Sequence, residues 1–598
     1  MIRNIFIPPY LRRGITHNWI GYPHRLTLFG ADFETYEGKP YSLQIYDGKD
    51  VYFRYVNEKN VLDVFLKYFD KRLLAGQLNV CYFHNLSFDL GVLFYKFHSL
   101  YIGRDIIKVK NNDWKISACI SKVCFARLRR GKTLLNLYDT LAFLQGGSLD
   151  NWCKKLDLPV KKLKKPDGLG TVRLKSKSFI NYAKNDAVAE YHLGKYVLSQ
   201  YEKYNTRICV SSASFSARIF RHKFMIKGET IDYPDDKRLI EGAILSYHGG
   251  RNGYYYPNPA VFENCCEVDI SSAYPYALSC LPNFAHGEYR HVEGFSGEGE
   301  GIYEISGVYT GCKYPSVFNH DFSVIKNNSF VDRLWITSYE LKEAITDRSF
   351  KNLKIQQGFI FFEDVKAEHN PFKNFVDSFY KLKEENRNDV LNYYIYKIIL
   401  NSLYGKFIQT NGFGDEVILD IDNAGNITIN NSDSVEGKRY YVAGGLFNPF
   451  IATLITGFTR AYLHRLEHKF RAIHSSTDSV KFNFKNYTGD VKGLGGYKLE
   501  VIGKCIILRN KLYIHYNEKG VIEKYALHGF SGYTDKEKGI TPVSMLLKMI
   551  DEKTNEYKTR RILKVKEGIR QGKTPLKMLD FEKTLNVDLS TIEQVSSY

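Results

Sequence analysis

The 598-residue chain lacks most features that assign a sequence to a familiar class. It has no apolar run of membrane-spanning length and no hydrophobic segment of a signal peptide, so we expect no membrane partner. It has no internal repeat and no low-complexity linker. Its ten cysteines are scattered, and no pair has the spacing of zinc ligands. We therefore expect reduced thiols and a cytoplasmic protein.

What the chain does contain is aromatic and basic. Tyrosine occurs 45 times and phenylalanine 39 times, and a hydrophobic content of 44% is that of a globular protein. Lys and Arg number 84 against 65 Asp and Glu, a formal net charge of +19. The length indicates several domains. A basic surplus with many aromatic rings favours single-stranded nucleic acid as a partner, although the charge could serve solubility alone.

A first pair of acids lies at the end of an apolar strand. Residues 25–31 run into Asp32-Phe33-Glu34, and alternate strand residues share a face, so both carboxylates point the same way. Residues 41–53 alternate like an antiparallel strand with an Asp47-Gly48 turn. The opening therefore predicts a β-meander that carries an acidic pair.

Two more carboxylates lie in separate segments. Asp89 follows the point where a predicted strand gives way to a helix. Asp186 lies one turn after Tyr182 on a helix expected over residues 179–193, which Gly194 would end. Each acid alone would be a solvated surface residue. Together the four match a two-metal phosphodiesterase site, in which carboxylates hold two divalent cations.

A helix expected over residues 389–403, ended by Gly405, organises the second half. Lys397, Asn401 and Tyr404 are spaced i, i+4 and i+7, so they share one face. A cation beside a flat ring suits a triphosphate and a base. The alternative is an ordinary amphipathic helix with a lysine at its edge.

Two strands on either side of this helix end in an aspartate. One ends at Asp269, after which Ser271 or Ser272 can cap a helix with Pro275 in its first turn. The other segment turns tightly at Asp478 before a further strand.

The first four acids stand in motifs that resemble ExoI, ExoII and ExoIII of the DEDDy 3′–5′ exonuclease domain of family B DNA polymerases. These motifs are ADFET (31–35), YFHNLSFD (82–89) and YAKND (182–186). The resemblance implies metal ligands at Asp32, Glu34, Asp89 and Asp186, and a nucleophile-positioning role for Tyr182. It implies contacts with single-stranded DNA from Thr35, Tyr82, His84, Asn85, Phe88, Thr140 and Leu141. The family also places a lysine nearby, and residues 161–165 leave several candidates open, Lys165 among them.

The second set resembles polymerase motifs A, B and C. DISSAYP (269–275) is similar to motif A, which implies metal binding by Asp269 and the carbonyl of Ile270, with Tyr274 as the steric gate. The helix resembles motif B, which implies a catalytic, phosphate-neutralising Lys397. It also implies nucleotide binding by Asn401, Tyr404 and either Lys381 or Lys383, of which we choose Lys383. STDS (476–479) resembles motif C with Asp478 as ligand, but Ser476 replaces the family's first aspartate, so metal affinity or preference could differ.

Two short motifs complete the resemblance. Tyr247, Gly249 and Gly250 follow an apolar, strand-like run (243–245) and are similar to the YxGG motif that contacts the template. The alternative is a hairpin turn, since glycines also serve turns. Lys511 and Tyr513 resemble the KxY motif near the primer terminus, and would otherwise be part of a charged edge strand.

The spacing of the motifs favours the protein-primed subgroup. About 120 residues separate motifs A and B, and residues 412–441 predict a protruding hairpin; the two segments resemble the TPR1 and TPR2 insertions. The expected order is a basic leader (1–25), an exonuclease domain (26–210), a first palm part with the YxGG linker (211–283), TPR1 (284–371), fingers (372–408), TPR2 (409–443), a second palm part (444–540) and a thumb (541–598).

The sequence thus predicts a mixed α/β, multidomain fold: an RNase H-like exonuclease domain followed by a right-hand polymerase. The resemblance implies a monomeric, replicative viral DNA polymerase that binds primer-template, single-stranded DNA and dNTPs. It further implies priming from a terminal protein, strand displacement, and two Mg²⁺ per site, with Mn²⁺ as a substitute. One alternative is an exonuclease with a degenerate polymerase half, suggested by Ser476. Another is a basic DNA-binding protein whose carboxylates are surface residues.

Overall fold

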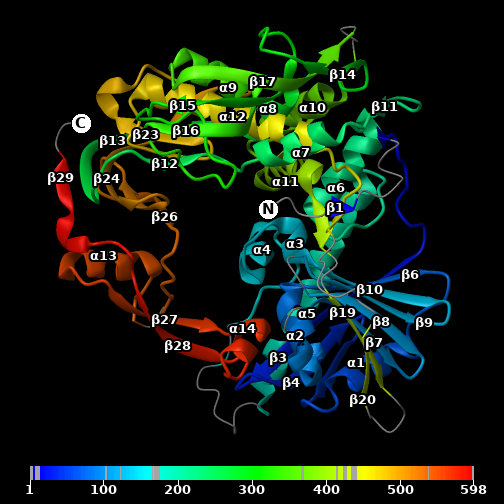
Figure 1. Cartoon of the computed structure of the whole chain (residues 1–598). Helices are drawn as coiled ribbons and strands as arrows, with labels where there is room; N and C mark the ends of the chain where they lie inside the picture. Colours follow the sequence, from blue (N-terminus) through cyan, green and yellow to red (C-terminus); the bar gives the residue numbers. More distant parts are fainter. Residues whose placement is uncertain are drawn as a thin grey trace.

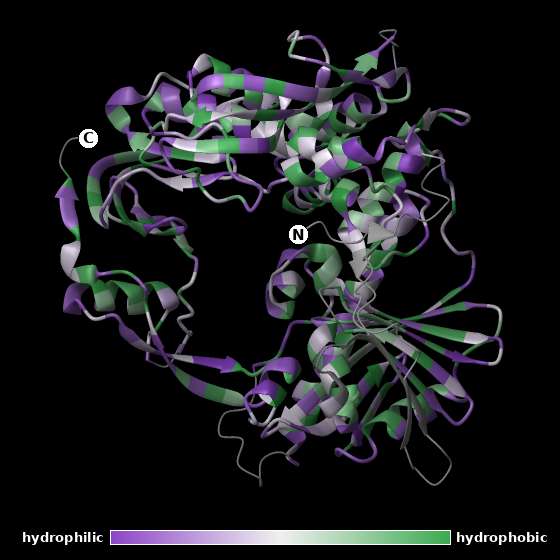
Figure 2. Cartoon of the chain, in the orientation of Figure 1, coloured by the Kyte–Doolittle hydropathy of each residue, from purple (hydrophilic) through white to green (hydrophobic). Residues whose placement is uncertain are grey.

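Figure 1 shows the computed structural model of the chain, whose ribbons follow a ring. It describes residues 5–6, 14–101, 104–120, 123–164, 166, 175–364, 369–412, 415–421, 427–431, 441–535 and 538–595. The amino-terminal domain lies at the bottom right, the central domain at the top, and the carboxy-terminal arm at the left. Hydrophobic and hydrophilic segments are interspersed along most elements in Figure 2. Among the described helices, none is long and apolar enough to cross a membrane.

One ten-stranded sheet forms the amino-terminal domain. Its order is β20 (Ile427–Asn431), β19 (Asp415–Ile421), β7 (Arg104–Asn111), β8 (Trp114–Cys119), β9 (Phe125–Arg130), β10 (Thr133–Asp139), β6 (Leu78–Phe83), β3 (Leu26–Tyr36), β4 (Lys39–Tyr46) and β5 (Val51–Tyr55). Strands β3, β6 and β10 run parallel, while β3, β4 and β5 form the predicted antiparallel meander. The meander and the parallel strands together give the expected RNase H-like arrangement.

Five helices accompany this sheet: α1 (Val61–Phe69), α2 (Leu86–Leu93), α3 (Thr140–Leu144), α4 (Leu149–Lys155) and α5 (Lys177–Lys203). Helix α5 packs against β3. It continues past Gly194, whereas the sequence predicts that the helix ends there. A Cβ at Gly194 would lie 2.6 Å from Cδ2 of Tyr82. The glycine is therefore a packing residue that admits the Tyr82 ring, and it does not terminate the helix.

The central domain is built on a second sheet. Its order is β12 (Asn252–Tyr254), β22 (His474–Ser476), β23 (Ser479–Asn483), β13 (Ala260–Ile270), β24 (Tyr497–Arg509), β25 (Leu512–Tyr516) and β26 (Ile522–Leu527). Helices α8 (Ala273–Ser279) and α12 (Pro449–Phe470) pack together beside it. The sheet thus brings the two predicted strand ends, at Asp269 and Asp478, onto neighbouring strands.

The helix that carries Lys397 packs in a small helical layer with α6 (Ser212–Ile219) and α10 (Pro371–Glu385). This helix, α11 (Val390–Ser402), begins at Asp389, whose side chain accepts hydrogen bonds from two backbone N–H groups. Its last residue is Ser402, and Tyr404–Ile408 follows as a 3₁₀ turn. The predicted helix, 389–403, is therefore confirmed to within one residue at each end, and Tyr404 lies on the turn that follows.

The apolar run 243–245 is not a strand. It forms the last part of helix α7 (Lys237–Ser246), which packs against α12. Ala243 is fully buried, which explains the apolar residues without a sheet. The helix ends at Tyr247, so the following loop leads from α7 into β12.

The two predicted insertions are separate structures. Residues 284–371 contain a four-stranded sheet in the order β14 (Gly287–Val292), β17 (Phe350–Glu363), β15 (Glu300–Tyr309) and β16 (Ser329–Thr337). Helix α9 (Ser338–Thr346) follows β16 and packs on α12. In the second insertion, β19 and β20 form the predicted hairpin, and β19 pairs in parallel with β7. The hairpin thereby extends the amino-terminal sheet.

The described part of the expected leader is tied to the fold. Strand β1 (Ile5–Phe6) pairs with β21 (Tyr441–Ala443), and β2 (Ile15–Thr16) pairs with β11 (Thr230–Ile231). Ile15 is 3% exposed. The described residues of the leader are therefore part of the fold, because strand pairing and burial join them to distant segments of the chain.

The carboxy-terminal arm returns to the amino-terminal domain. It comprises α13 (Pro542–Glu552), β27 (Glu556–Ile562), α14 (Val565–Arg570), β28 (Met578–Thr584) and β29 (Glu593–Val595). Val565 and Leu576 are buried in the hydrophobic core of the amino-terminal domain. Lys577 Nζ lies 3.2 Å from a carboxylate oxygen of Glu37. These contacts close the ring seen in Figure 1.

We predict that Leu576→Gly releases the tip of the arm. Leu576 has φ = 60°, which strains a non-glycine residue, so burial of its side chain holds this conformation. Glycine relieves the strain but loses the contact, and amide hydrogen exchange in residues 563–577 should accelerate about tenfold or more. The matched control is Lys553→Gly, because Lys553 has φ = 51° and is exposed. Equal exchange in wild type and Leu576→Gly would contradict the docking.

Candidate active sites

The first four predicted acids come together in the amino-terminal domain. Asp32 and Glu34 lie on β3 and Asp186 on α5, and one oxygen from each lies within 4.8 Å of the others. Asp89, on α2, accepts a hydrogen bond of 3.3 Å from the N–H of Phe33. The strand places its two acids on one face, as the alternation predicts, and the two helices bring the others.

Burial and mutual repulsion dominate the electrostatics of this cluster. Burial raises the pKa of Asp32 well above its usual value, and the carboxylates of Glu34, Asp89 and Asp186 raise it further. Burial also raises the pKa of Asp89 well above its usual value. Such a group is stable as a set of anions only beside a cation, so the donor set fits divalent metal ions, which prefer carboxylate oxygens.

A lysine and a tyrosine complete the cluster. Lys162 Nζ lies 2.9 Å from Asp186 Oδ2. Burial is the largest single effect on the pKa of Lys162 and lowers it, but the carboxylates of Asp186, Asp32 and Glu190 together raise the pKa above its usual value. Burial and then Glu34 raise the pKa of Tyr182, whose ring lies 5.9 Å from Lys162 Nζ. The sequence left the lysine undecided; Lys162 now occupies that place, and Lys165 lies outside the described residues.

Glu190 is a fifth acid that the sequence analysis missed. It lies one turn beyond Asp186 on α5 and is 2% exposed. Burial raises its pKa well above the usual value, and Asp32 raises it further. The four-residue spacing of Tyr182, Asp186 and Glu190 on one helix face was the available signal.

Four of the predicted DNA contacts form one corner beside the acids. His84 Nδ1 lies 2.9 Å from Thr140 Oγ1. Asp139 Oδ1 accepts hydrogen bonds of 2.9 Å from the N–H groups of both Asn85 and Leu141. Asp139, which the sequence analysis did not select, therefore joins the start of α2 to the start of α3. Among the other predicted contacts, Thr35 and Phe88 are half-buried.

Tyr82 does not belong with them. Its side chain is 1% exposed and its ring packs against Gly194 and Tyr138. Strand residues alternate between faces, and this face of β6 is covered by α5. The prediction that Tyr82 contacts DNA is therefore replaced by a role in the core.

The second acidic site lies at the edge between β13 and β23. Asp269 pairs with Ser479 in the strand register, and the N–H of Ile270 donates a 2.7 Å hydrogen bond to the carbonyl of Asp478. Thr477, in the turn before Asp478, has φ = 55°. This tight turn and the adjacent strand place the two carboxylates side by side.

Burial and then Asp478 raise the pKa of Asp269 to about 7. Burial also raises the pKa of Asp478. A cation that the sequence analysis missed moderates both shifts: Lys524, whose Nζ lies 2.9 Å from Glu267 Oε1. Glu267 is itself buried and ion-paired with the buried Lys481. The pair of aspartates therefore fits divalent cations and stands on an internal layer of paired charges.

Aromatic rings flank the second site. Tyr274 stacks on Tyr404 with ring centroids 4.1 Å apart and an angle of 5° between the planes. A Cβ at Gly250 would lie 2.8 Å from Oη of Tyr274 and 2.7 Å from a methyl carbon of Thr477. The loop between α7 and β12 therefore needs glycine at 250 because it touches this site. Gly249 is exposed and Tyr247 half-buried on the same loop.

The structure separates the two candidate lysines on α10. Lys383 is 5% exposed and its Nζ donates a 3.0 Å hydrogen bond to Ser272 Oγ. Burial lowers its pKa, and the nearby Lys397 lowers it further. The side chain of Lys381, by contrast, is 76% exposed. The hydroxyl of Ser272 thus accepts a hydrogen bond from Lys383. The sequence offered Ser272 as a side-chain cap of α8, but its side chain makes no capping hydrogen bond.

Asn401 is half-buried on α11, and Lys397 is exposed. The positive charge of Lys397 acts to lower the pKa of Asp478, against the effect of burial. The helix face predicted from the i, i+4 spacing is therefore turned toward the second site.

Ser476 stands where the family pattern has an aspartate. It lies at the end of β22, and its Oγ is 3.4 Å from Oδ1 of Asn252 on β12. The serine removes one negative charge from the surroundings of Asp269 and Asp478. Two carboxylates remain, which is the smallest set that can bridge a pair of divalent cations.

The KxY residues lie at the start of β25 in the same sheet. Lys511 occupies the β24–β25 turn with φ = 57°, and its N–H donates to His474 Nε2 at 3.3 Å. Tyr513 is 6% exposed, with Lys481 Nζ 3.9 Å from its ring centroid. Tyr513 is therefore a core residue that covers the buried Lys481, and of the two only Lys511 remains a candidate for DNA contact.

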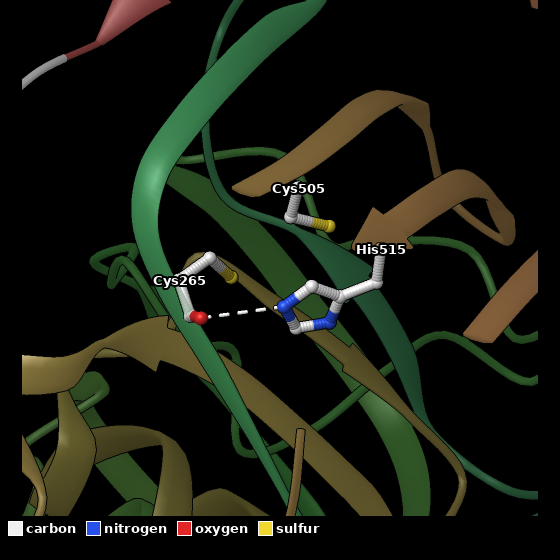
Figure 3. Close-up of side chains that lie close together, drawn as sticks. All are labelled: Cys265, Cys505 and His515. Atoms are coloured by element: carbon white, nitrogen blue, oxygen red, sulfur yellow. Dashed lines mark hydrogen bonds between the residues drawn. The ribbon is translucent and has the colours of Figure 1, made fainter. Parts of the chain in front are cut away.

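Figure 3 shows a Cys–Cys–His cluster on strands β13, β24 and β25 of the central sheet. Cys265, Cys505 and His515 are fully buried, and His515 Nε2 lies 3.2 Å from the carbonyl oxygen of Cys265. Lys481 Nζ lies 3.4 Å from the other ring nitrogen of His515. Since an ammonium group repels a metal ion and occupies a ligand atom, this cluster is a polar part of the core. None of the ten cysteines, all of which lie in the described part of the chain, forms a disulfide, in agreement with the predicted reduced thiols.

Sequence comparisons place the chain beside DNA polymerases. Residues 175–448 match the family model described as DNA polymerase type B, organellar and viral. A probable DNA polymerase of Neurospora intermedia is 24% identical over 392 residues, covering 59% of this chain and 39% of that protein. The DNA-directed DNA polymerase of Enterobacteria phage PRD1 is 29% identical over 223 residues, covering 34% and 39%. The chain spans about two fifths of the length of these curated relatives.

Solved structures share the fold. Phi29 DNA polymerase complexed with primer-template DNA and incoming nucleotide substrates has a TM-score of 0.66 at 17% identity. Phi29 DNA polymerase complexed with single-stranded DNA has a TM-score of 0.62 at 17% identity. Each match covers 94% of this chain and 100% of that chain. The predicted fold class, a mixed α/β multidomain architecture with exonuclease and polymerase parts, is confirmed.

We predict that Asp269→Asn stabilises the metal-free protein at pH 8. The pKa of Asp269 is raised from 3.8 to about 7, so folding favours the protonated acid and the free energy of unfolding falls as pH rises from about 4 to about 7. Removing the charge should restore roughly 1–4 kcal/mol above that range. The measurement is thermal melting in EDTA across pH. The exposed Asp235→Asn is the control. An unchanged melting temperature for Asp269→Asn at pH 8 would contradict the buried repulsion.

Proposed function

We propose that the chain, of which residues 175–448 match the model of the organellar and viral type B DNA polymerases, is a protein-primed, replicative DNA polymerase with 3′–5′ proofreading. The observation that carries the proposal is the meeting of Asp269 and Asp478 beside the Tyr274–Tyr404 stack. Two buried acids of raised pKa, next to flat rings and two lysines, suit nucleotide addition.

In polymerisation, Asp269, Asp478 and the carbonyl of Ile270 would hold two divalent cations. When bound, such cations would supply positive charge that offsets the charge of the triphosphate during attack by the primer 3′-hydroxyl. Lys397 and Lys383 neutralise the phosphates, and the buried Lys383 is fixed by Ser272.

The remaining groups of this site select the nucleotide. The ring of Tyr274 lies beneath the sugar, where a 2′-hydroxyl would clash, and Tyr404 supports it by stacking. Asn401 lines the same pocket. Gly249, Gly250 and Tyr247 guide the template strand, and Gly250 lies against Tyr274.

In proofreading, Asp32, Glu34, Asp89 and Asp186 would hold divalent cations, which would supply the activation of water needed to hydrolyse the last phosphodiester. Lys162 holds the Asp186 carboxylate, and Tyr182 orients the water. The corner formed by His84, Asn85, Thr140 and Leu141, with Thr35 and Phe88, binds the frayed primer end.

Protein priming and strand displacement rest on the two inserted segments. The sheet at 284–371 would receive a terminal protein, whose hydroxyl side chain replaces the primer hydroxyl. The hairpin at 412–441 extends the amino-terminal sheet, and the docked arm completes a ring around the path of the DNA. A ring of this kind favours processive, strand-displacing synthesis by a monomer. Ser476, in place of an acidic residue, favours a second candidate function: an exonuclease whose polymerase half is inactive.

The deciding experiment is extension of a singly primed circular template with dNTPs and Mg²⁺. Products many times the length of the circle are the expected result. Asp478→Asn should lower extension by about 10³-fold or more while exonuclease activity persists, since one charged ligand of the reacting phosphate is lost. Extension that stops after one circle would overturn strand displacement. Primer degradation without extension, with Mg²⁺ or Mn²⁺, would establish the nuclease.

We predict that Lys162→Met lowers exonuclease turnover by about 10²-fold, because it removes the cation that holds Asp186 and faces Tyr182. Polymerisation should be unchanged, since the second site contains none of these residues. Lys161→Met is the matched control, because Lys161 is exposed and adjacent. Equal loss in both variants would show that general basicity, and not the Lys162–Asp186 pair, supports hydrolysis.

A further inference from the structure

Two histidines and an aspartate meet where the inserted sheet joins the central domain. His464 and His468 lie one turn apart on α12, and Asp347 directly follows α9. One ligand atom from each lies within 4.8 Å of the others. None of the three belongs to either site described above.

Both imidazoles face the same carboxylate oxygen. Nε2 of His464 lies 2.6 Å from Asp347 Oδ2, and Nε2 of His468 lies 3.8 Å from it. The i, i+4 spacing on a helix is the arrangement in which two histidines bind one metal ion. The ring of Tyr314 packs edge-on against His468, with centroids 4.9 Å apart, and orients it.

The second nitrogen of His464 gives an independent reason. His464 is 1% exposed, and its Nδ1 has no hydrogen-bond partner among the described residues. It lies 4.0 Å from Oε2 of Glu467. Burial disfavours the doubly protonated ring, and a neutral imidazole has only one N–H for two carboxylates.

Each neutral tautomer leaves one conflict. With the proton on Nε2, the Nδ1 lone pair of His464 faces the Glu467 carboxylate. With the proton on Nδ1, this N–H of His464 is attracted to the Glu467 carboxylate. The Nε2 lone pair then faces Asp347 Oδ2 at 2.6 Å. A cation held between Nε2 and Asp347 resolves the second case. Ligating histidines commonly direct their other N–H toward a carboxylate in this way.

We propose that Asp347, His464 and His468 bind a divalent transition-metal ion of the zinc class. Imidazole nitrogens select such ions over Mg²⁺, which prefers oxygen ligands. Three protein ligands leave a fourth position for water. His468 is 46% exposed, so the metal has a route from solvent and the water has room.

The surrounding charges permit a cation. The nearest buried guanidinium, Arg251, is ion-paired with Glu467, and Arg465 lies 3.6 Å from Glu343. The Cys265–Cys505–His515 cluster differs in this respect, because Lys481 occupies it.

The site has a structural consequence. It joins α9, which follows the inserted sheet, to the last turns of α12, and α12 leads through β22 to Asp478. The metal would therefore fix the inserted segment to the element that positions the second active site. The proposal does not depend on the proposed function, and its test does not use activity.

The test is a titration of chelator-treated full-length protein with Co²⁺ in the presence of excess Mg²⁺, which fills carboxylate sites. We expect a visible absorption band of tetrahedral Co²⁺ that saturates at one equivalent and is displaced by one equivalent of Zn²⁺. Zn²⁺ should also raise the melting temperature. Absence of the band in the wild-type protein would overturn the proposal.

Variants assign the band. His468→Gln should abolish it and weaken Zn²⁺ binding at least tenfold, and this exposed position keeps the His464–Asp347 hydrogen bond and the fold. Asp347→Asn should act in the same way. His24→Gln, at another exposed histidine, and Asp186→Asn and Asp478→Asn should retain the band. A band that persists in His468→Gln, or that disappears in Asp186→Asn or Asp478→Asn, would overturn the assignment.

Discussion

The repulsion between buried carboxylates is the constraint on which the rest of this structure depends. Asp32, Glu34 and Asp186 lie within a few ångströms of one another, and Asp269 lies beside Asp478. In a low-dielectric interior such groups oppose folding, which is the reason for their raised pKa values. Divalent cations bound to these carboxylates would remove the repulsion, because they would neutralise the negative charges.

Paired internal charges hold the frame around these acids. Below Asp269, Glu267 is paired with Lys481 and Lys524. Beside the glycine loop, Arg460 Nε lies 2.7 Å from Glu340 Oε1 and its Nη1 donates to the carbonyl of His248. Breaking such a buried pair costs about 3–5 kcal/mol, because it leaves an uncompensated charge. These pairs therefore tie α9, α12 and the loop into one unit around the second site.

Closure of the ring relies on different forces. The tip of the arm docks through the buried side chains of Val565 and Leu576, and the hairpin docks through backbone pairing of β19 with β7. Neither contact involves the acids of the two sites. They determine which domains stay together, whereas the charges determine the geometry of each site.

The sequence by itself determined which acids are candidates for each site and the helix that carries Lys397, because motif spacing and local periodicity report on residues close along the chain. It could not assign Lys162, Lys383 over Lys381, or the buried positions of Tyr82 and Tyr513, because each depends on which element packs against it. Gly194 shows the same limit: it lies inside α5 because the Tyr82 ring takes the space that a side chain would fill. Only the tertiary structure brought Asp347 to His464 and His468, and the arm to the amino-terminal core, since these contacts join residues more than a hundred positions apart.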